Sequence, residues 1–267
     1  MSINKKFLIR GSLFALGVIA VGLTVAIAAL KFFLSGPPSG TPPPPPTILA
    51  PRGALPEIAV GLSEYAKYSG DDYVLAGSGF LIRTKVGDIV AVTTAHSISL
   101  GDPDRLLEQI AFGYEGEFVV EMDTLYGNPG KPRLGPDMSV DYVLLQVADD
   151  VDPQLILLAD PRGGPQAGER VSLFSGISEA QSGLRTFSGS VQAVDRYGAW
   201  VLMDDAFQPG LMSGSPILSM HTGKVVGMAI SAAQTDAGMM IGMHSIASLV
   251  EKAQSASVFP KLIDYRR

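Results

Sequence analysis

The chain has 267 residues, of which 46% are hydrophobic and 17% charged, and its net charge is −6. This is enough apolar material for one large domain or two small ones with a buried core. The absence of cysteine excludes disulfides and thiolate metal sites. Residues 1–35 carry four basic side chains and no acid, so removing them from −6 leaves −10 for the rest. An acidic remainder lacks the electrostatic footprint of a protein that binds nucleic acid or anionic lipid surfaces.

Residues 11–34 are predicted to form a transmembrane signal-anchor helix. Residues 11–30 contain no charge, and twenty such residues can span a bilayer as a helix. Because Lys5, Lys6 and Arg10 precede this run, we expect residues 1–10 to stay in the cytoplasm and the rest to be periplasmic or extracellular. An alternative stays open, since residues 26–28 (Ala-Ile-Ala) resemble a signal-peptide cleavage site and the cleaved protein would be secreted.

Residues 35–56 form a proline-rich linker, with consecutive prolines from Pro42 to Pro46. Such a segment favours an extended, semi-rigid spacer that cannot join a helix or a sheet interior. A folded domain is therefore expected over residues 57–267.

That domain is predicted to be mostly β. Short apolar or alternating runs, bounded by Gly, Asp, Asn and Pro, are typical of a barrel or sandwich. The predicted strands are residues 73–75, 79–84, 89–93, 117–121, 142–147, 170–174, 186–193, 200–203, 216–219, 224–232 and 239–243. Two segments are predicted to be helical: residues 104–110, and residues 246–253 with Ser245 as a candidate cap.

A serine in a turn of small residues is the first candidate for chemistry. Ser213 lies within residues 209–216, Pro-Gly-Leu-Met-Ser-Gly-Ser-Pro. A serine hydroxyl becomes a nucleophile only when a base takes its proton and donors stabilise the oxyanion. The alternative interpretation is an ordinary turn between strands.

Three histidines are available to supply that base. His96 follows the apolar run that begins at Val90, and the end of a strand can hold a side chain rigidly beside a cleft. His221 is expected in an exposed hairpin turn. His244 precedes the predicted C-terminal helix, where a structural or capping role is expected.

These segments resemble the trypsin-like serine peptidases of the chymotrypsin fold. One strand begins Gly-Ser-Gly-Phe at residues 77–80, and the next ends Thr-Ala-His at His96. Further on, Asp141 opens an apolar strand and Ser213 begins Ser-Gly-Ser-Pro. The likeness is closest to the cysteine-free bacterial branch that includes the high-temperature-requirement proteases, here without a PDZ domain.

The resemblance implies two six-stranded antiparallel β-barrels, at about residues 57–160 and 165–244, and a C-terminal helix at about 245–255. It also implies a catalytic triad, in which Ser213 attacks an acyl carbonyl, His96 transfers the proton and Asp141 orients His96.

The same resemblance implies an oxyanion hole formed by the N–H groups of Leu211 and Ser213. The family has glycine where this chain has Leu211, and leucine is strained there if the turn needs a positive φ. The absence of an acid from the groove favours a small or apolar residue before the scissile bond. The residues expected to line that groove are Phe207, Ser231, Ala232 and Ala233.

The sequence thus predicts a membrane-tethered, extracytoplasmic serine endopeptidase that acts on protein or peptide through an acyl-enzyme, with no metal and no organic cofactor. Its membrane partner is reached through the N-terminal helix, and no nucleic-acid partner is expected. One alternative is a catalytically impaired protease-like module that binds peptide or a partner protein in the same groove. Another is a structural β-domain on a stalk.

Overall fold

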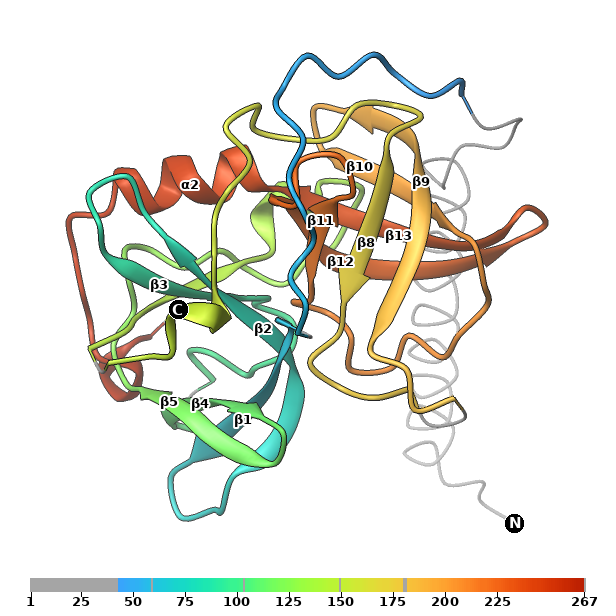
Figure 1. The fold of residues 1–267 in the computed structure, drawn as a ribbon. Helices are drawn as coiled ribbons and strands as arrows, with labels where there is room; N and C mark the ends of the chain where they lie inside the picture. The colour runs from blue at the N-terminus through green and yellow to red at the C-terminus, as the bar shows by residue number, and fades with distance from the viewer. Residues whose placement is uncertain (1–42, 59, 103, 149, 180–181, 267) are drawn as a thin grey trace, which may run out of the picture. The chain divides into compact units, whose positions relative to one another are not determined.

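The computed structural model describes residues 43–58, 60–102, 104–148, 150–179 and 182–266, which form two β-sheets and a C-terminal helix (Figure 1). The predicted transmembrane helix at residues 11–34 lies outside these residues. Among the residues that are described, no helix is both long and apolar enough to cross a membrane.

The first sheet has seven strands, in the order β5-β4-β1-β2-β3-β6 with β7 paired to β2. Its strands are β1 (Leu62–Tyr68), β2 (Val74–Arg83), β3 (Ile89–Thr93), β4 (Leu107–Tyr114), β5 (Glu117–Met122), β6 (Val143–Gln146) and β7 (Ile156–Leu157). β5 ends at Met122, and in the described residues the edge strands β5 and β6 form no ladder with each other; beyond β5 a single isolated bridge links Leu125 to Leu145 of β6. The sheet is therefore a half-barrel rather than the predicted closed six-stranded barrel.

The second sheet is a closed barrel in the order β10-β13-β12-β11-β8-β9, which confirms the predicted six-stranded barrel. Its strands are β8 (Arg170–Phe174), β9 (Thr186–Asp195), β10 (Gly198–Met203), β11 (Pro216–Ser219), β12 (Val225–Thr235) and β13 (Gly238–Ser245). Helix α2 (Ile246–Gln254) follows β13 directly. Ser245 caps it by accepting a hydrogen bond from the N–H of Ala247, as predicted.

The helix predicted at residues 104–110 is wrong, because β4 begins at Leu107. β4 pairs with β1 along one edge and with β5 along the other, so its backbone groups are satisfied by neighbouring strands. A helix of seven residues is marginal by itself, since nucleation costs more than so few internal hydrogen bonds return. β1 was not among the predicted strands, although buried and half-buried residues alternate along it.

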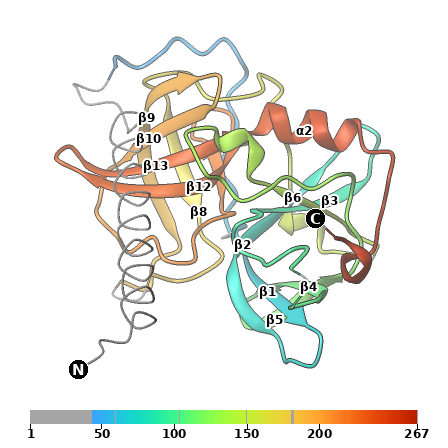
Figure 2. The same ribbon diagram turned by 180° about the vertical axis from the view of Figure 1, so that it is seen from behind.

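Each sheet encloses its own apolar core, and a third core lies between the two sheets. The first-sheet core is built around Phe112 and Leu145, and the barrel core around Val201 and Ile241. The core between the sheets takes side chains from both of them and from α2. Its members include Phe80, Val92, Leu144, Met228, Ile230 and Leu249. This shared core holds the ends of strands from the two sheets beside one another (Figures 1 and 2).

Residues 43–58 run as an extended segment against the second barrel, shown in blue in Figure 1. His221 fastens this segment twice: its Nε2 contacts the carbonyl oxygen of Ala50 at 2.8 Å, and its own carbonyl accepts the N–H of Gly53 at 2.9 Å. Gly223 permits the approach, because a Cβ there would lie 1.9 Å from the carbonyl oxygen of Ala54. The hairpin turn of β11 and β12 is therefore a contact surface for the N-terminal segment.

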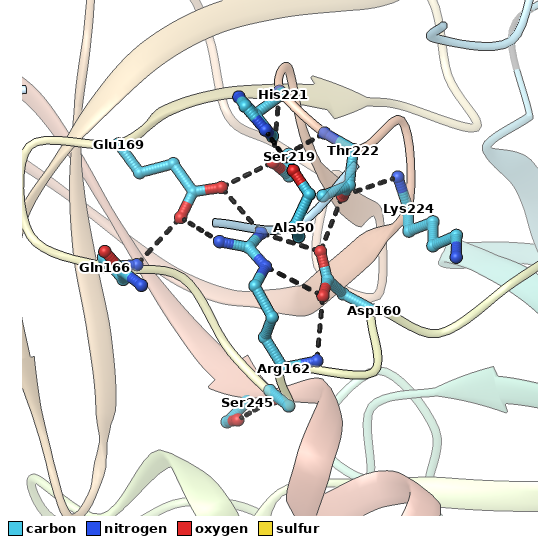
Figure 3. Close-up of polar contacts among 11 residues, drawn as sticks. Ala50, Asp160, Arg162, Gln166, Glu169, Ser219, His221, Thr222, Lys224 and Ser245 are labelled. Atoms are coloured by element: carbon cyan, nitrogen blue, oxygen red, sulfur yellow. Dashed lines mark hydrogen bonds and ion pairs between the residues drawn. The ribbon is translucent and has the colours of Figure 1, made fainter. Parts of the chain in front are cut away.

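A buried ion-pair network lies directly beneath that hairpin turn (Figure 3). The guanidinium of Arg162 reaches Asp160 at 2.7 Å and Glu169 at 2.9 Å, and both carboxylates are almost fully buried. The hydroxyl of Thr222 donates to Asp160 at 2.6 Å, and that of Ser219 donates to Glu169. Buried carboxylates are tolerated only when paired and hydrogen-bonded in this way.

We predict that Arg162→Met lowers the free energy of unfolding by about 3–5 kcal/mol, because it leaves two buried carboxylates without their cation. Arg170→Met is the matched control, since Arg170 pairs with Asp204 at the surface, with both side chains more than two-fifths exposed. That change should cost less than about 1 kcal/mol. Urea unfolding at pH 7 measures both, and equal losses would contradict the expectation.

Candidate active site

His96 and Asp141 lie at the same edge of the first sheet because β3 and β6 are antiparallel neighbours. Thr93, the last residue of β3, pairs with Val143, the first residue of β6. His96 follows β3 by three residues, and Asp141 ends the short 3-10 turn η1 (Met138–Val140) just before β6. The pairing of these two strands therefore brings together side chains 45 residues apart in the chain.

The carboxylate of Asp141 is the most heavily hydrogen-bonded group of this site. Oδ2 contacts Nδ1 of His96 at 2.8 Å and accepts the N–H of Arg133 at 3.1 Å. Oδ1 accepts the N–H groups of Ala95 at 2.8 Å and His96 at 3.1 Å. Burial opposes ionisation of Asp141, but these bonds and the attraction of His96 outweigh it and lower the pKa. Asp141 is thus a carboxylate at neutral pH.

That carboxylate decides which nitrogen of His96 carries the proton. A carboxylate only accepts hydrogen bonds, so Nδ1 must be the donor and Nε2 is left as the acceptor of neutral imidazole. Nε2 has no hydrogen-bond partner in the described part of the chain. The His96 side chain is 35% exposed, against 1% for Asp141, so its free nitrogen is open to solvent or substrate.

The turn that carries Ser213 comes from the barrel and packs against the start of β2 in the first sheet. The carbonyl of Ser213 accepts the N–H of Ser78 at 3.0 Å, and the Ser78 hydroxyl donates to the carbonyl of Leu211 at 3.0 Å. Gly214 permits this contact, because a Cβ there would lie 1.8 Å from the Ser78 carbonyl oxygen. The two sheets therefore hold the Ser213 turn between them.

Leu211 adopts a positive φ of 64°. This is the conformation in which a leucine is expected to be strained. Non-glycine residues reach this left-handed region at a cost of roughly 1–2 kcal/mol. The N–H groups of Leu211 and Ser213, the predicted oxyanion-hole donors, form no hydrogen bond within the described residues. The leucine therefore occupies the backbone conformation that glycine favours, and both donors are free.

The Ser213 hydroxyl points toward β12, where it donates to the carbonyl of Ile230 over a long 3.4 Å. Within the described residues it forms no hydrogen bond with His96. The structure brings His96 and Asp141 into contact and leaves Ser213 outside it. Catalytic hydrogen bonds are often long or poorly aligned without substrate and tighten in the complex.

An open strand edge begins beside Ser213. β11 pairs with β12 only as far as Met228, whereas β12 continues to Thr235, paired with β13 on its other side. On the side away from β13, the described residues place no strand against Ile230–Ala233. Ser231, Ala232 and Ala233 are half-buried along this stretch. An open edge of this kind can accept an extended peptide as an additional strand.

Phe207 lies in the core of the barrel. It is 9% exposed, and its ring stacks on that of Phe187 with a centroid distance of 4.2 Å. It also lines a hollow of about 760 Å³ that contains neither His96 nor Ser213. Ala232 packs against the same core cluster. Phe207 and the groove residue Ala232 thus share one core cluster.

The surroundings of His96 differ from those of the other two histidines. A hollow of about 330 Å³ lies beside His96, with walls that include Ile98, Leu100 and Pro132. His221 holds the N-terminal segment. His244 is fully buried edge-to-face against Tyr142, and burial lowers its pKa to about 4 against a weaker opposing effect of the Asp141 backbone. His244 therefore stays neutral, in a structural role as expected. No group of residues able to hold a metal ion occurs in the part of the chain described.

Sequence reasoning missed two groups that shape the site. The backbone N–H of Arg133 reaches Asp141 from a segment without regular structure, and no sequence pattern indicates it. The Ser78 hydroxyl braces the Leu211 carbonyl and also accepts the N–H of Gly176 at 3.2 Å. Its signal was available in the Gly-Ser-Gly motif at residues 77–79, where a small polar residue lies between two glycines.

Comparison with known proteins places the chain in a family. Residues 77–228, more than half of the chain, match the family described as trypsin-like peptidase domain. No curated protein sequence gives a significant match. With this match on the fold and site above, the chain belongs to the trypsin-like peptidase family.

Solved structures share the fold at low sequence identity. Protease Anisep from Arthrobacter nicotinovorans has a TM-score of 0.51 and 14% identity, over 76% of this chain and 99% of that one. Human heparin binding protein has a TM-score of 0.52 and 12% identity, over 77% of this chain and 94% of that one. The serine endoprotease from Yersinia pestis has a TM-score of 0.49 and 18% identity over 73% of this chain, which spans only 61% of that protein.

We predict that Leu211→Gly leaves the protein as stable as the wild type or up to about 1 kcal/mol more stable. Glycine removes the strain of a positive φ but loses roughly 0.5–1 kcal/mol of chain entropy on folding. Leu211→Val should destabilise, because a β-branched residue is a stronger outlier at this φ. Gly210→Ala is the control, since nothing lies within 4 Å of a Cβ there. Urea unfolding gives the order, and a Val variant as stable as the Gly variant would contradict it.

Proposed function

We propose that this chain is a serine endopeptidase that cleaves peptide bonds with Ser213, His96 and Asp141. The observation that carries the proposal is the buried Asp141 carboxylate on Nδ1 of His96 at 2.8 Å, at the edge where the Ser213 turn meets the first sheet. Membership of the trypsin-like peptidase family supports this assignment. The likeness to the high-temperature-requirement branch belongs to the same proposal.

In this mechanism Nε2 of His96 takes the proton of the Ser213 hydroxyl as Oγ attacks the substrate carbonyl. Asp141 holds the ring in the required tautomer and stabilises the imidazolium that forms. His96 then gives the proton to the leaving amine, which departs and leaves an acyl-enzyme on Ser213. A water molecule, deprotonated in turn by His96, hydrolyses that ester and restores the enzyme.

The oxyanion of the tetrahedral intermediate would be stabilised by the N–H groups of Leu211 and Ser213. Both amides are free of other partners in the described residues, and the positive φ of Leu211 is held by the Ser78 bond to its carbonyl. Removing one such donor typically costs two to three orders of magnitude in rate. The backbone strain at Leu211 would then be the loss of stability that accompanies a correctly formed oxyanion hole.

Substrate would bind as an extended strand on the open edge of β12 from Ile230 to Ala233. This mode uses main-chain hydrogen bonds and needs no chain terminus, which suits cleavage within a polypeptide. Ser231, Ala232 and Ala233 carry no charge, so we expect a small or apolar residue before the scissile bond. Phe207 would act through the core cluster that it shares with Ala232.

A second candidate is a catalytically impaired module that binds peptide or a partner protein in the same groove. The separation of Ser213 from His96 and the strain at Leu211 favour it. The fold by itself does not decide between the two, because its neighbours include a protein named as a protease and one named for binding rather than for proteolysis.

A fluorophosphonate probe distinguishes these candidates. The full-length protein in detergent should be labelled at Ser213, while Ser213→Ala should not react. Asp141→Asn should lower the labelling rate by roughly four orders of magnitude, because the amide favours the wrong tautomer of His96. Asp137→Asn is the control, since Asp137 caps η1 instead of contacting His96. A folded protein that never labels and cleaves no casein would exclude the endopeptidase.

We also propose that residues 11–34 tether this domain to a membrane, with the catalytic part outside the cytoplasm. The support is the uncharged stretch of residues 11–30 after Lys5, Lys6 and Arg10. The intact chain should remain in the membrane fraction after carbonate extraction, and a chain lacking residues 1–34 should not. Recovery of a soluble protein whose N-terminus follows Ala28 would show a cleaved signal peptide instead.

A further inference from the structure

Glu64 is a buried carboxyl group that the mechanism above does not use. It lies on β1, is 0% exposed, and neither carboxyl oxygen has a hydrogen-bond partner in the described residues. The nearby hydroxyl of Thr93 lowers the pKa of Glu64, but less than burial raises it. This hydroxyl donates its proton to the carbonyl of Ser78 at 3.0 Å. An unpaired carboxyl at such a site is expensive to ionise. It calls for an explanation beyond packing, because an apolar residue would fill the space at lower cost.

The position of Glu64 connects it to both halves of the active site. A Cβ on Gly77 would lie 2.9 Å from Oε2 of Glu64, 3.0 Å from the hydroxyl of Ser97 and 3.3 Å from the carbonyl oxygen of Ser213. One point on β2 is therefore shared by the carboxyl, the residue after His96 and the backbone of Ser213. Gly77 leaves the space into which the carboxyl projects.

The backbone directs the carboxyl toward this point. Glu64 pairs with Gly77 of β2, and the register of that pairing shifts between Glu64 and Tyr65. A bulge re-aims a side chain and often occurs next to an active site. On the other edge of β1, Glu64 pairs with Phe112 of β4, which belongs to the apolar core.

Among the described residues, no charged group is a cause of the pKa shift of Glu64. Burial is the main cause that raises its pKa to about 8, and the Thr93 hydroxyl opposes this rise in part. The Ser213 turn, residues 209–216, contains no charged residue. The titratable groups on β1 itself and on the described elements packed around it are not among the causes of this shift. They are Tyr65, Lys67 and Tyr68 on β1, Arg83 on β2, Glu108 and Tyr114 on β4, His96 after β3, and Arg185 beside Gly61.

We propose that Glu64 is a positioning residue: its neutral carboxylic acid packs between the His96 loop and the Ser213 turn, and its ionisation disturbs their alignment. The inference rests on the proposed function, because the alignment matters for proton transfer between His96 and Ser213. An uncompensated negative charge at this point draws in water or moves the side chain outward. Either response displaces Gly77, Ser97 or the Ser213 backbone.

The sign of the pH effect follows from the direction of the shift. The unfolded chain loses the Glu64 proton near pH 4.5, whereas the folded protein keeps it until about pH 8. Between these values the folded state binds more protons, so stability falls as pH rises through this window. Above pH 8 the folded protein itself carries the charge, and the active site loses its alignment there.

The test compares the wild type with Glu64→Gln, which keeps the shape and cannot ionise, and with Glu117→Gln as an exposed control. Fluorophosphonate labelling of the full-length protein is followed from pH 5 to pH 10. At pH 9 the wild type and the control should label about tenfold more slowly than at their plateau. Glu64→Gln should keep its plateau rate across this range. Glu64→Met provides a second non-ionisable variant if the amide impairs folding.

Identical alkaline limbs in the wild type and both Glu64 variants would overturn the proposal. A wild type that never labels would instead disprove the proposed function. In that case the Nδ1 proton of His96, which is hydrogen-bonded to Asp141, still tests Glu64 without turnover when it is followed by NMR. Its signal should change between pH 7 and pH 9 in the wild type and stay constant in Glu64→Gln, and a constant signal in both would overturn the proposal.

Discussion

The site depends on one buried negative charge, the carboxylate of Asp141. Burial alone would keep this group protonated, and the N–H groups of Ala95, His96 and Arg133 together with Nδ1 of His96 reverse that tendency. The same bonds lock the His96 loop to the segment before β6. The charge therefore fixes the position of the base and its tautomer together.

The second constraint is the close contact between the sheets at Ser78. The Ser213 turn accepts two hydrogen bonds from this residue, one from its N–H and one from its hydroxyl, and Gly214 has no room for a side chain against it. With the turn pinned at both ends, Leu211 takes the backbone conformation that remains, at a positive φ. Backbone strain of this kind persists where the surrounding contacts over-determine a residue, as they do at functional sites. The Glu64 carboxyl, which has no hydrogen-bond partner in the described residues, lies near the same contact and also lowers the stability of the fold there.

The outline of the fold was predictable because alternation of apolar and polar residues is a local signal. It located most strands, whereas the closed six-stranded barrel was implied by the resemblance to the trypsin-like peptidases. It failed at β4, where Leu107 to Ile110 fit a helical period and only pairing with β1 and β5 decides for a strand. The contact of residues 43–58 with His221 was also unpredictable, since proline content indicates an extended chain and says nothing of what it lies against.

The sequence by itself determined the residue types and their order: a histidine after an apolar strand, an aspartate before another, and a serine in a turn of small residues. These properties are local, so they can be recognised without knowing which strands pair. Tertiary structure alone decided that Asp141 meets His96, that Leu211 has a positive φ, and that Glu64 is buried without a hydrogen-bond partner among the described residues. Each of these results from contacts between segments far apart in the chain, where the energy of one residue is set by neighbours that its own sequence context does not specify.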